Sequence, residues 1–194
     1  MPPHAETDHA PVDPASLRLR MFPDPCLREH ARPVGEVTEE VRQVAQRMLE
    51  IMHAEEGIGL AAPQVGLAWR MFVCRLPADP HAEPAESGLP VDTEGEPMVC
   101  IDPELSLEGP ISPFEEGCLS LPDIRGMVQR PPIVRLEATN LDGERFSVRG
   151  DGLLARCWQH EMDHLDGVLI IDKFAQLDRL RTRSALRRLE KRNA

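Results

Sequence analysis

The chain has 194 residues, of which 41% are hydrophobic and 28% charged, and these proportions favour one globular domain of ordinary size. A net charge of −11 argues against DNA or an anionic membrane as a partner of the whole chain, and 4% aromatic residues with no Tyr argue against a stacking surface for single-stranded nucleic acid. No stretch is apolar over the roughly 18 residues that a membrane span needs, and the first residues do not read as a secretory signal. The expected compartment is therefore the cytoplasm, with the five cysteines reduced.

Composition divides the chain into three parts. Residues 1–15 are polar and Pro-rich and are expected to form a flexible extension. Residues 16–175 carry the periodic segments and are expected to form the catalytic domain, whereas residues 176–194 form a basic helix. Two acidic and seven basic residues occur in that helix, the basic ones being Arg179, Arg181, Arg183, Arg187, Arg188, Lys191 and Arg192.

Hydrophobic spacing predicts two further helices. The first starts after Thr38, a typical N-cap residue, and is expected to end near Glu56, with Gly57 as its stop. The second covers residues 153–165, between Asp151 as N-cap and Gly167 as stop.

Apolar or alternating runs predict strands at 70–76, 98–101, 105–107, 133–140 and 145–149, the last two joined by a turn at Asp142-Gly143. A break is expected at Asp102-Pro103, and residues 77–97 read as a long surface loop. The predicted fold is α+β, with short mixed and antiparallel strands and hairpins around one central helix.

The central helix contains the sequence H-E-x-x-H. His160 and His164 are four residues apart and therefore lie on one face of the helix, where both imidazoles can bind one metal ion. Glu161 is displaced around the helix and can act as a base towards a water molecule at the metal. Such histidine pairs also occur on protein surfaces, but Leu153 and Cys157 continue the same stripe and suggest that it faces the core. Asp163 and Asp166 are candidates to accept hydrogen bonds from the imidazole rings, or are solvated.

The residues alone leave the third ligand open. His4, His9, His30, His53 and His81 are the remaining histidines, and none has a sequence context typical of a ligand. A zincin-like metallopeptidase needs a third His or Glu downstream of the helix, and only Glu190, in the basic tail, is available. An electron-transfer copper site and a purely structural metal site also compete with a hydrolytic metal site at this stage.

Three motifs together resemble those of peptide deformylases. G-I-G-L-A-A-P-Q-V-G at 57–66, E-E-G-C-L-S-L-P at 115–122 and Q-H-E-M-D-H at 159–164 match the family patterns G-x-G-x-A-A-x-Q, E-G-C-x-S and H-E-x-x-H, in the family's order. The resemblance covers about residues 16–175 and implies the peptide deformylase fold around a metal-binding helix. It implies an enzyme that removes the formyl group from the N-terminal formyl-methionine of newly made polypeptides.

The resemblance also implies roles for individual residues. Cys118, His160 and His164 would bind the metal, Glu161 would act as general base and then acid, and Gln64 with the backbone N–H of Leu119 would stabilise the oxyanion. Substrate contacts are implied for Gly57, Ile58, Gly59, Gly117, Arg125, Leu153 and Cys157. An ion pair between Glu116 and Arg130 would brace the loop of Cys118.

The resemblance implies Fe²⁺ as the divalent metal, with Zn²⁺, Ni²⁺ or Co²⁺ able to substitute. The expected partners are nascent formyl-methionyl polypeptides, with neither membrane nor DNA. The basic C-terminal helix suggests docking on ribosomal RNA, and a solvated basic face explains its charge equally well.

Overall fold

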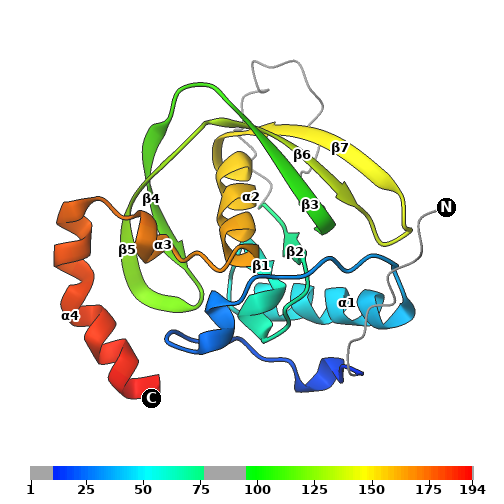
Figure 1. Ribbon diagram of the computed structural model, residues 1–194, viewed down its shortest axis with the longest axis horizontal. Coiled ribbons are helices and arrows are strands. Elements are labelled where there is room, and N and C mark those ends of the chain that lie inside the picture. Colours follow the sequence, from blue (N-terminus) through cyan, green and yellow to red (C-terminus); the bar gives the residue numbers. More distant parts are fainter. Residues whose placement is uncertain (1–10, 77–94, 194) are drawn as a thin grey trace.

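The computed structural model describes residues 11–76 and 95–193 and shows two antiparallel sheets with a helix between them (Figure 1). The larger sheet has the strand order β1-β2-β3-β6-β7, and the smaller one pairs β4 with β5. The strands are β1 (Gly59–Ala61), β2 (Met71–Cys74), β3 (Met98–Glu108), β4 (Ser112–Cys118), β5 (Leu121–Arg130), β6 (Ile133–Thr139) and β7 (Arg145–Asp151). The predicted α+β class is confirmed. All ladders between the named strands are antiparallel, and within residues 11–76 and 95–193 parallel pairing is limited to a bridge between Arg32 and Trp69.

Helix α2 (Gly152–Leu165) packs against β1, β2, β6 and β7 and lies beside the β4–β5 hairpin (Figure 1). The other helices are α1 (Glu39–Ala54), α3 (Ile170–Lys173) and α4 (Gln176–Asn193). The basic helix expected at 176–194 corresponds to α4, which packs on β5, whereas the short helix α3 before it was not predicted. Within the described part of the chain, no helix is long and apolar enough to cross a membrane.

Helix α1 begins as predicted but ends in a different way. The Thr38 side chain accepts a hydrogen bond from the Val41 N–H at 3.4 Å. At the other end Glu56, rather than Gly57, adopts the left-handed conformation (φ 54°), and the Gly57 N–H donates to the Met52 carbonyl. A Cβ atom at position 57 would lie 2.7 Å from the end of the Leu119 side chain, which would have to move to admit it, so packing favours glycine there.

The strand predictions need two corrections. The chain does not break at Asp102-Pro103, because β3 continues through a bulge there and the Asp102 carboxylate accepts hydrogen bonds from the N–H groups of Val34 and Gly35. The β4–β5 hairpin was not predicted. Strand β4 has few apolar residues, and the buried positions of β5 include Gly126 and Arg130, which hide its alternation.

The boundary of the expected N-terminal extension also differs from the prediction. Residues 11–15, expected to be part of a flexible extension, are packed on α1: the Val12 N–H donates to Glu40, and Asp13 caps a short 3-10 turn at Pro14–Ser16. Residues 1–10 and 77–94, which include most of the predicted surface loop, lie outside the described residues.

Candidate metal centre

Two elements bring three metal-ligating side chains together. Cys118 ends β4, and His160 and His164 lie one turn apart on α2. One ligand atom from each lies within 4.8 Å of the others, and the Cys118 Sγ is 3.2 Å from the His164 Nε2. A thiolate with two imidazoles is a donor set that suits Zn²⁺ or Fe²⁺ and leaves a coordination position free. The residues therefore fit a single divalent metal ion.

Strand β4 runs beside α2, and its alternate residues face the helix. Glu116 contacts His160 and Cys118 contacts His164, four residues further along α2. Side chains two apart on a strand and four apart on a helix repeat at similar distances, about 6 to 7 Å. This matching of periods places a cysteine against a histidine that is 46 residues away in sequence.

The protonation states of the ligands follow from their burial. Burial lowers the pKa of His164 well below its ordinary value, so its ring is neutral. Burial also raises the pKa of the Cys118 thiol to about 12. A metal must therefore displace the thiol proton when it binds, which makes metal affinity rise with pH.

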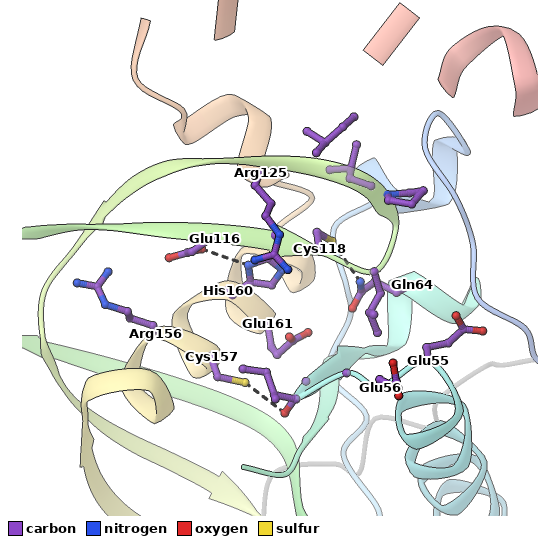
Figure 2. Close-up of a pocket in the computed structure, with 18 of the residues that line it drawn as sticks. Glu55, Glu56, Gln64, Glu116, Cys118, Arg125, Arg156, Cys157, His160 and Glu161 are labelled. Carbon is purple, nitrogen blue, oxygen red and sulfur yellow. Dashed lines mark hydrogen bonds and ion pairs between the residues drawn. The ribbon is translucent and has the colours of Figure 1, made fainter. Parts of the chain in front are cut away.

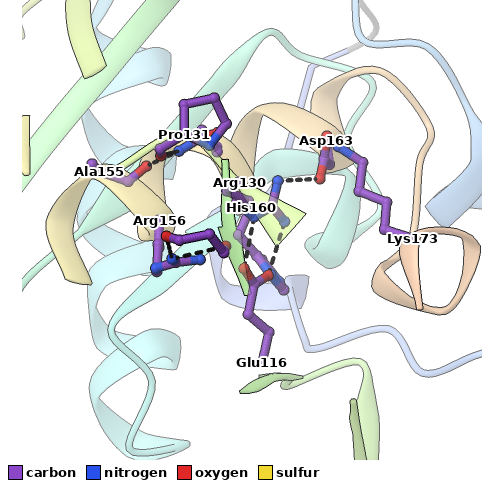
Figure 3. A network of polar contacts seen from close by, with 10 residues as sticks. Glu116, Arg130, Pro131, Ala155, Arg156, His160, Asp163 and Lys173 are labelled. Atoms are coloured by element: carbon purple, nitrogen blue, oxygen red, sulfur yellow. Dashed lines mark hydrogen bonds and ion pairs between the residues drawn. The ribbon is translucent and has the colours of Figure 1, made fainter. Parts of the chain in front are cut away.

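A buried ion-pair network positions His160 (Figure 3). Glu116 accepts from Arg130 Nε and Nη2 at 2.7 and 2.8 Å and lies 3.3 Å from the His160 Nδ1. Burial alone would raise the pKa of the Glu116 carboxyl, but the hydrogen bonds from Arg130 and His160 lower it to about 2. The ionised carboxylate can accept the Nδ1 proton of His160, which would leave Nε2 free to bind a metal.

The network continues away from the metal. Arg130 Nη1 donates to Asp163 at 2.8 Å, and Lys173 donates to the same carboxylate at 2.6 Å. Asp166 instead pairs with Arg70. The idea that Asp163 and Asp166 accept from the histidine rings is therefore wrong, and the acceptor for His160 is Glu116. Within the described residues, the buried His164 Nδ1 has no hydrogen-bond partner.

Glu161 lies about 100° around α2 from His160, against β1. Its side chain is 3% exposed, and within the described residues its Oε2 has no hydrogen-bond partner. Burial raises the pKa of its carboxyl well above the ordinary value. A Cβ atom at Gly59 would collide with this carboxylate and would lie 2.8 Å from the Cys157 Sγ. Gly59, which is expected to let a substrate backbone approach, therefore also leaves room for the Glu161 carboxylate.

The two expected oxyanion donors lie beside Cys118. The buried Gln64 accepts from the Ala61 N–H at 2.8 Å, and its Nε2 lies 3.2 Å from the Ser120 Oγ and 3.5 Å from the Cys118 Sγ. Leu119 lies in the turn that joins β4 to β5. Sequence reasoning missed Ser120, which is fully buried, although it is the serine of the E-G-C-L-S motif.

A cavity of about 570 Å³ opens onto these groups (Figure 2). All the expected substrate residues line it, namely Gly57, Ile58, Gly59, Gly117, Arg125, Leu153 and Cys157, together with Gln64, Cys118, Leu119, His160 and Glu161. Leu153 was expected to face the core, but it is 45% exposed at the rim. Phe114 and Arg156 also line the cavity, and sequence reasoning did not single them out.

An open metal-ligand set with an adjacent buried carboxylate defines a metal-dependent hydrolase. Comparison with known proteins agrees with this class. The sequence profile of the polypeptide deformylase family matches residues 16–180. The chain is 44% identical over 176 residues to a peptide deformylase of Acinetobacter baumannii, covering 90% of this chain and 92% of that protein.

Solved structures give the same result. A peptide deformylase from Synechococcus elongatus in complex with actinonin is 38% identical, with a TM-score of 0.75 over 89% of this chain and 86% of that one. A plant peptide deformylase, PDF1B, is 36% identical, with a TM-score of 0.78 over 91% and 90% of the two chains. The chain belongs to the polypeptide deformylase family.

Proposed function

We propose that this enzyme removes the N-terminal formyl group of newly made polypeptides by the residue roles described below. The observation that carries the proposal is the arrangement of one cysteine and two histidine ligand atoms within 4.8 Å. They lie in an open cavity beside the buried carboxylate of Glu161, whose Oε2 has no hydrogen-bond partner among the described residues. Family membership supplies the reaction, and this arrangement supplies the groups that perform it.

Cys118, His160 and His164 would hold the cation, which when bound supplies positive charge to activate a water molecule and polarise the formyl carbonyl. Glu161 takes the proton of the attacking water, and its elevated pKa suits a group that must hold that proton. It then returns the proton to the leaving amine. Formate and a free N-terminus result.

Gln64 and the Leu119 N–H stabilise the negative charge that develops on the formyl oxygen. Gln64 is fixed through its Oε1 by the Ala61 N–H, so its Nε2 is held beside Cys118 before substrate arrives. A pre-oriented donor of this kind typically contributes about 10²–10³ to the rate.

The cavity lies between two strand edges that can pair with an extended peptide. Strand β1 is an edge of the larger sheet, and β4 belongs to the two-stranded one. Gly59 and Gly117 present backbone without side chains there, and Arg125 is the register partner of Gly117. Backbone pairing to these edges would tolerate many sequences after the first residue. Ile58 and Cys157 give the adjoining wall its apolar character.

We propose Fe²⁺ as the physiological metal, with Zn²⁺, Ni²⁺ or Co²⁺ as substitutes. The thiolate and imidazole donors accept any of these ions, so ligand type does not choose among them. Elemental analysis of enzyme purified without oxygen tests the assignment. Zn²⁺ as the sole bound metal, with full activity, would contradict it.

We also propose a cytoplasmic location and ribosome docking through α4. The seven basic side chains of α4 are exposed, whereas Leu189 is buried against the body of the protein. Because truncation would remove Leu189 and expose the buried cluster that it packs against, we suggest changing Arg183, Arg187 and Arg188 to Ser instead. Salt-dependent co-sedimentation with ribosomes should weaken; unchanged binding would favour a merely solvated face.

Release of formate from formyl-Met-Ala-Ser, compared with acetyl-Met-Ala-Ser, tests the function. We expect formate from the first and no hydrolysis of the second. Cleavage of an internal peptide bond instead would favour the zincin-like metallopeptidase. A metallopeptidase of that kind is disfavoured because the third ligand, Cys118, lies upstream of the helix and is a thiol.

A further inference from the structure

Strand β7 is the last strand of the larger sheet, and only one of its edges is paired (Figure 1). That edge forms a ladder with β6 along all seven residues, Arg145–Asp151. Within residues 11–76 and 95–193, no strand pairs with the other edge. An open edge is a template for a further strand, and proteins often block it with a proline or a bulge. Strand β7 has neither, because it contains no proline and its register with β6 does not shift.

The direction of the free backbone groups follows from the turn between β6 and β7. The Asn140 N–H donates to the Glu144 carbonyl at 3.0 Å, which makes these two residues a hydrogen-bonded pair. Such pairs alternate with non-bonded pairs along an antiparallel ladder, so every second residue of β7 after Glu144 bonds to β6. The N–H and carbonyl groups of the other four point out of the free edge, and these residues are Arg145, Ser147, Arg149 and Asp151.

The face of β7 towards α2 is apolar and incompletely covered. A Cβ atom at Gly150 would lie 2.7 Å from the Trp158 ring, which shows that this face packs on α2. Phe146 and Val148 lie on the same face, since side chains two apart on a strand point the same way. Both are only partly buried beside the core. A further strand at the free edge would cover more of their apolar surface.

The opposite face carries both signs of charge. Arg145 lies at one end of β7 and Asp151 at the other, and the Asp151 side chain makes no capping hydrogen bond to α2. Arg145 binds the Asp102 carbonyl at 2.8 Å and the Glu104 carboxylate at 3.1 Å, and its guanidinium has donors left for another carboxylate. A strand antiparallel to β7 with the same charges would place an arginine beside an aspartate at both ends.

We propose that β7 pairs with β7 of a second copy of this chain, antiparallel to it, about a two-fold axis at Val148. Arg145 then lies opposite Asp151 of the second copy, and Ser147 opposite Arg149, so all outward backbone groups face one another. An axis at Ser147 would set Arg145 against Arg149, and an axis at Arg149 would set two arginines against each other, which is unfavourable. The charges therefore select one register.

The contact extends the sheet across two copies. About eight backbone hydrogen bonds can form between them, and the Val148 side chains meet at the axis. Because each copy contributes the same surface, the contact closes at a dimer. Only one strand of each copy takes part, so we expect dissociation in the micromolar range. The inference does not depend on the proposed deformylation.

Sedimentation equilibrium of the full chain at about 5 to 500 µM tests the pairing. The wild-type chain should pass from monomer to dimer in this range. Ser147→Pro removes an outward N–H but no bond to β6, and should abolish the dimer. Arg145→Glu sets like charges opposite each other and should weaken the dimer about tenfold, whereas adding Asp151→Arg to it should restore association to within about threefold of wild type.

Arg47→Glu is the matched control, because Arg47 pairs with Glu50 on α1, away from β7, and its change should leave the dissociation constant as it is. Thermal unfolding shows which variants are folded. Val148→Cys gives a readout that keeps every charge: at the axis the Cα atoms would lie about 4.5 Å apart, so mild oxidation should link two chains by a disulfide. Wild-type protein oxidised in the same way should not be linked.

Two results would overturn the inference. One is a wild-type chain that stays monomeric at the highest concentration. The other is a dimer that Arg145→Glu does not weaken and that Val148→Cys does not link, because its interface would then lie elsewhere. If Ser147→Pro unfolds, the charge reversal and the disulfide decide.

Discussion

The side of α2 that faces β4 and β5 and the side that faces β1 differ in whether their buried charged groups are paired. On the side of β4 and β5, Glu116 and Arg130 satisfy each other and His160 in a closed network. On the side of β1, Glu161 is buried with no partner for its Oε2 among the described residues. Pairing would hold the proposed metal ligand His160 in one orientation, whereas burial without a paired cation raises the pKa of Glu161, the proposed general base. One helix thus separates positioning from reactivity.

The largest expected effect comes from removing the unpaired carboxylate. Glu161→Ala should lower kcat by about 10³- to 10⁴-fold, because proton transfer to and from the substrate is lost. Metal content should be unchanged, since Glu161 is not among the three grouped ligands. Formate release and elemental analysis on the same sample test this. Full activity in the variant would refute the role of Glu161, and loss of metal would show that the two sides are not separate.

Breaking the ion-pair network on the β4–β5 side of α2 should lower the stability of the fold rather than kcat. Arg130→Met leaves Glu116 and Asp163 without their shared partner and should destabilise the fold by about 3–5 kcal/mol, with weaker metal binding. Urea unfolding and chelator competition measure these effects. Arg149→Met, which breaks a more exposed pair, is the control and should cost no more than about 1 kcal/mol. Equal costs for the two variants would contradict the special role of the buried network.

The Glu116–Arg130 network should also make the stability of the fold fall at low pH. The folded-state pKa of Glu116 is about 2, below the ordinary value of 4.5, so its contribution is present above pH 4.5 and is lost as the pH falls towards 2. The difference between the ordinary pKa and the folded-state pKa of Glu116 corresponds to roughly 3 kcal/mol of folding stability. Urea unfolding of the metal-free protein between pH 6 and pH 2.5 should show this loss, and Glu116→Gln should flatten the profile. A wild-type profile as flat as that of the variant would exclude Glu116 as the cause.

A smaller and more local effect is expected at Gly59. Gly59→Ala places a methyl group where the Glu161 carboxylate now lies, so the carboxylate must shift. We expect kcat to fall by about 10²-fold, the usual result of misplacing a reacting group by about 1 Å, with metal binding preserved. Gly143→Ala is a control for strain without crowding: no atom lies within 4 Å of a Cβ there, but its φ of 82° disfavours any side chain, so stability should fall while kcat stays unchanged. Similar activity in both variants would show that the close packing is not needed.

Local sequence signals determined a large part of this protein. The cap at Thr38, the hairpin that pairs β6 with β7 and the helix bearing His160 and His164 all depend on residues within a few turns of one another, and all are present. Periodicity reports such neighbours directly, because it records which residues share a face.

Only the tertiary structure decided which distant groups meet. From the residues alone the third ligand stayed open, and the motif resemblance proposed Cys118, which β4 places against α2. Glu116 rather than Asp163 became the partner of His160, and Arg156 met Phe114, because the register of β4 along α2 sets these pairs. Strand β4 carries no clear alternation of its own and depends on β5 and α2 for its place, so its contacts could not be predicted from local patterns.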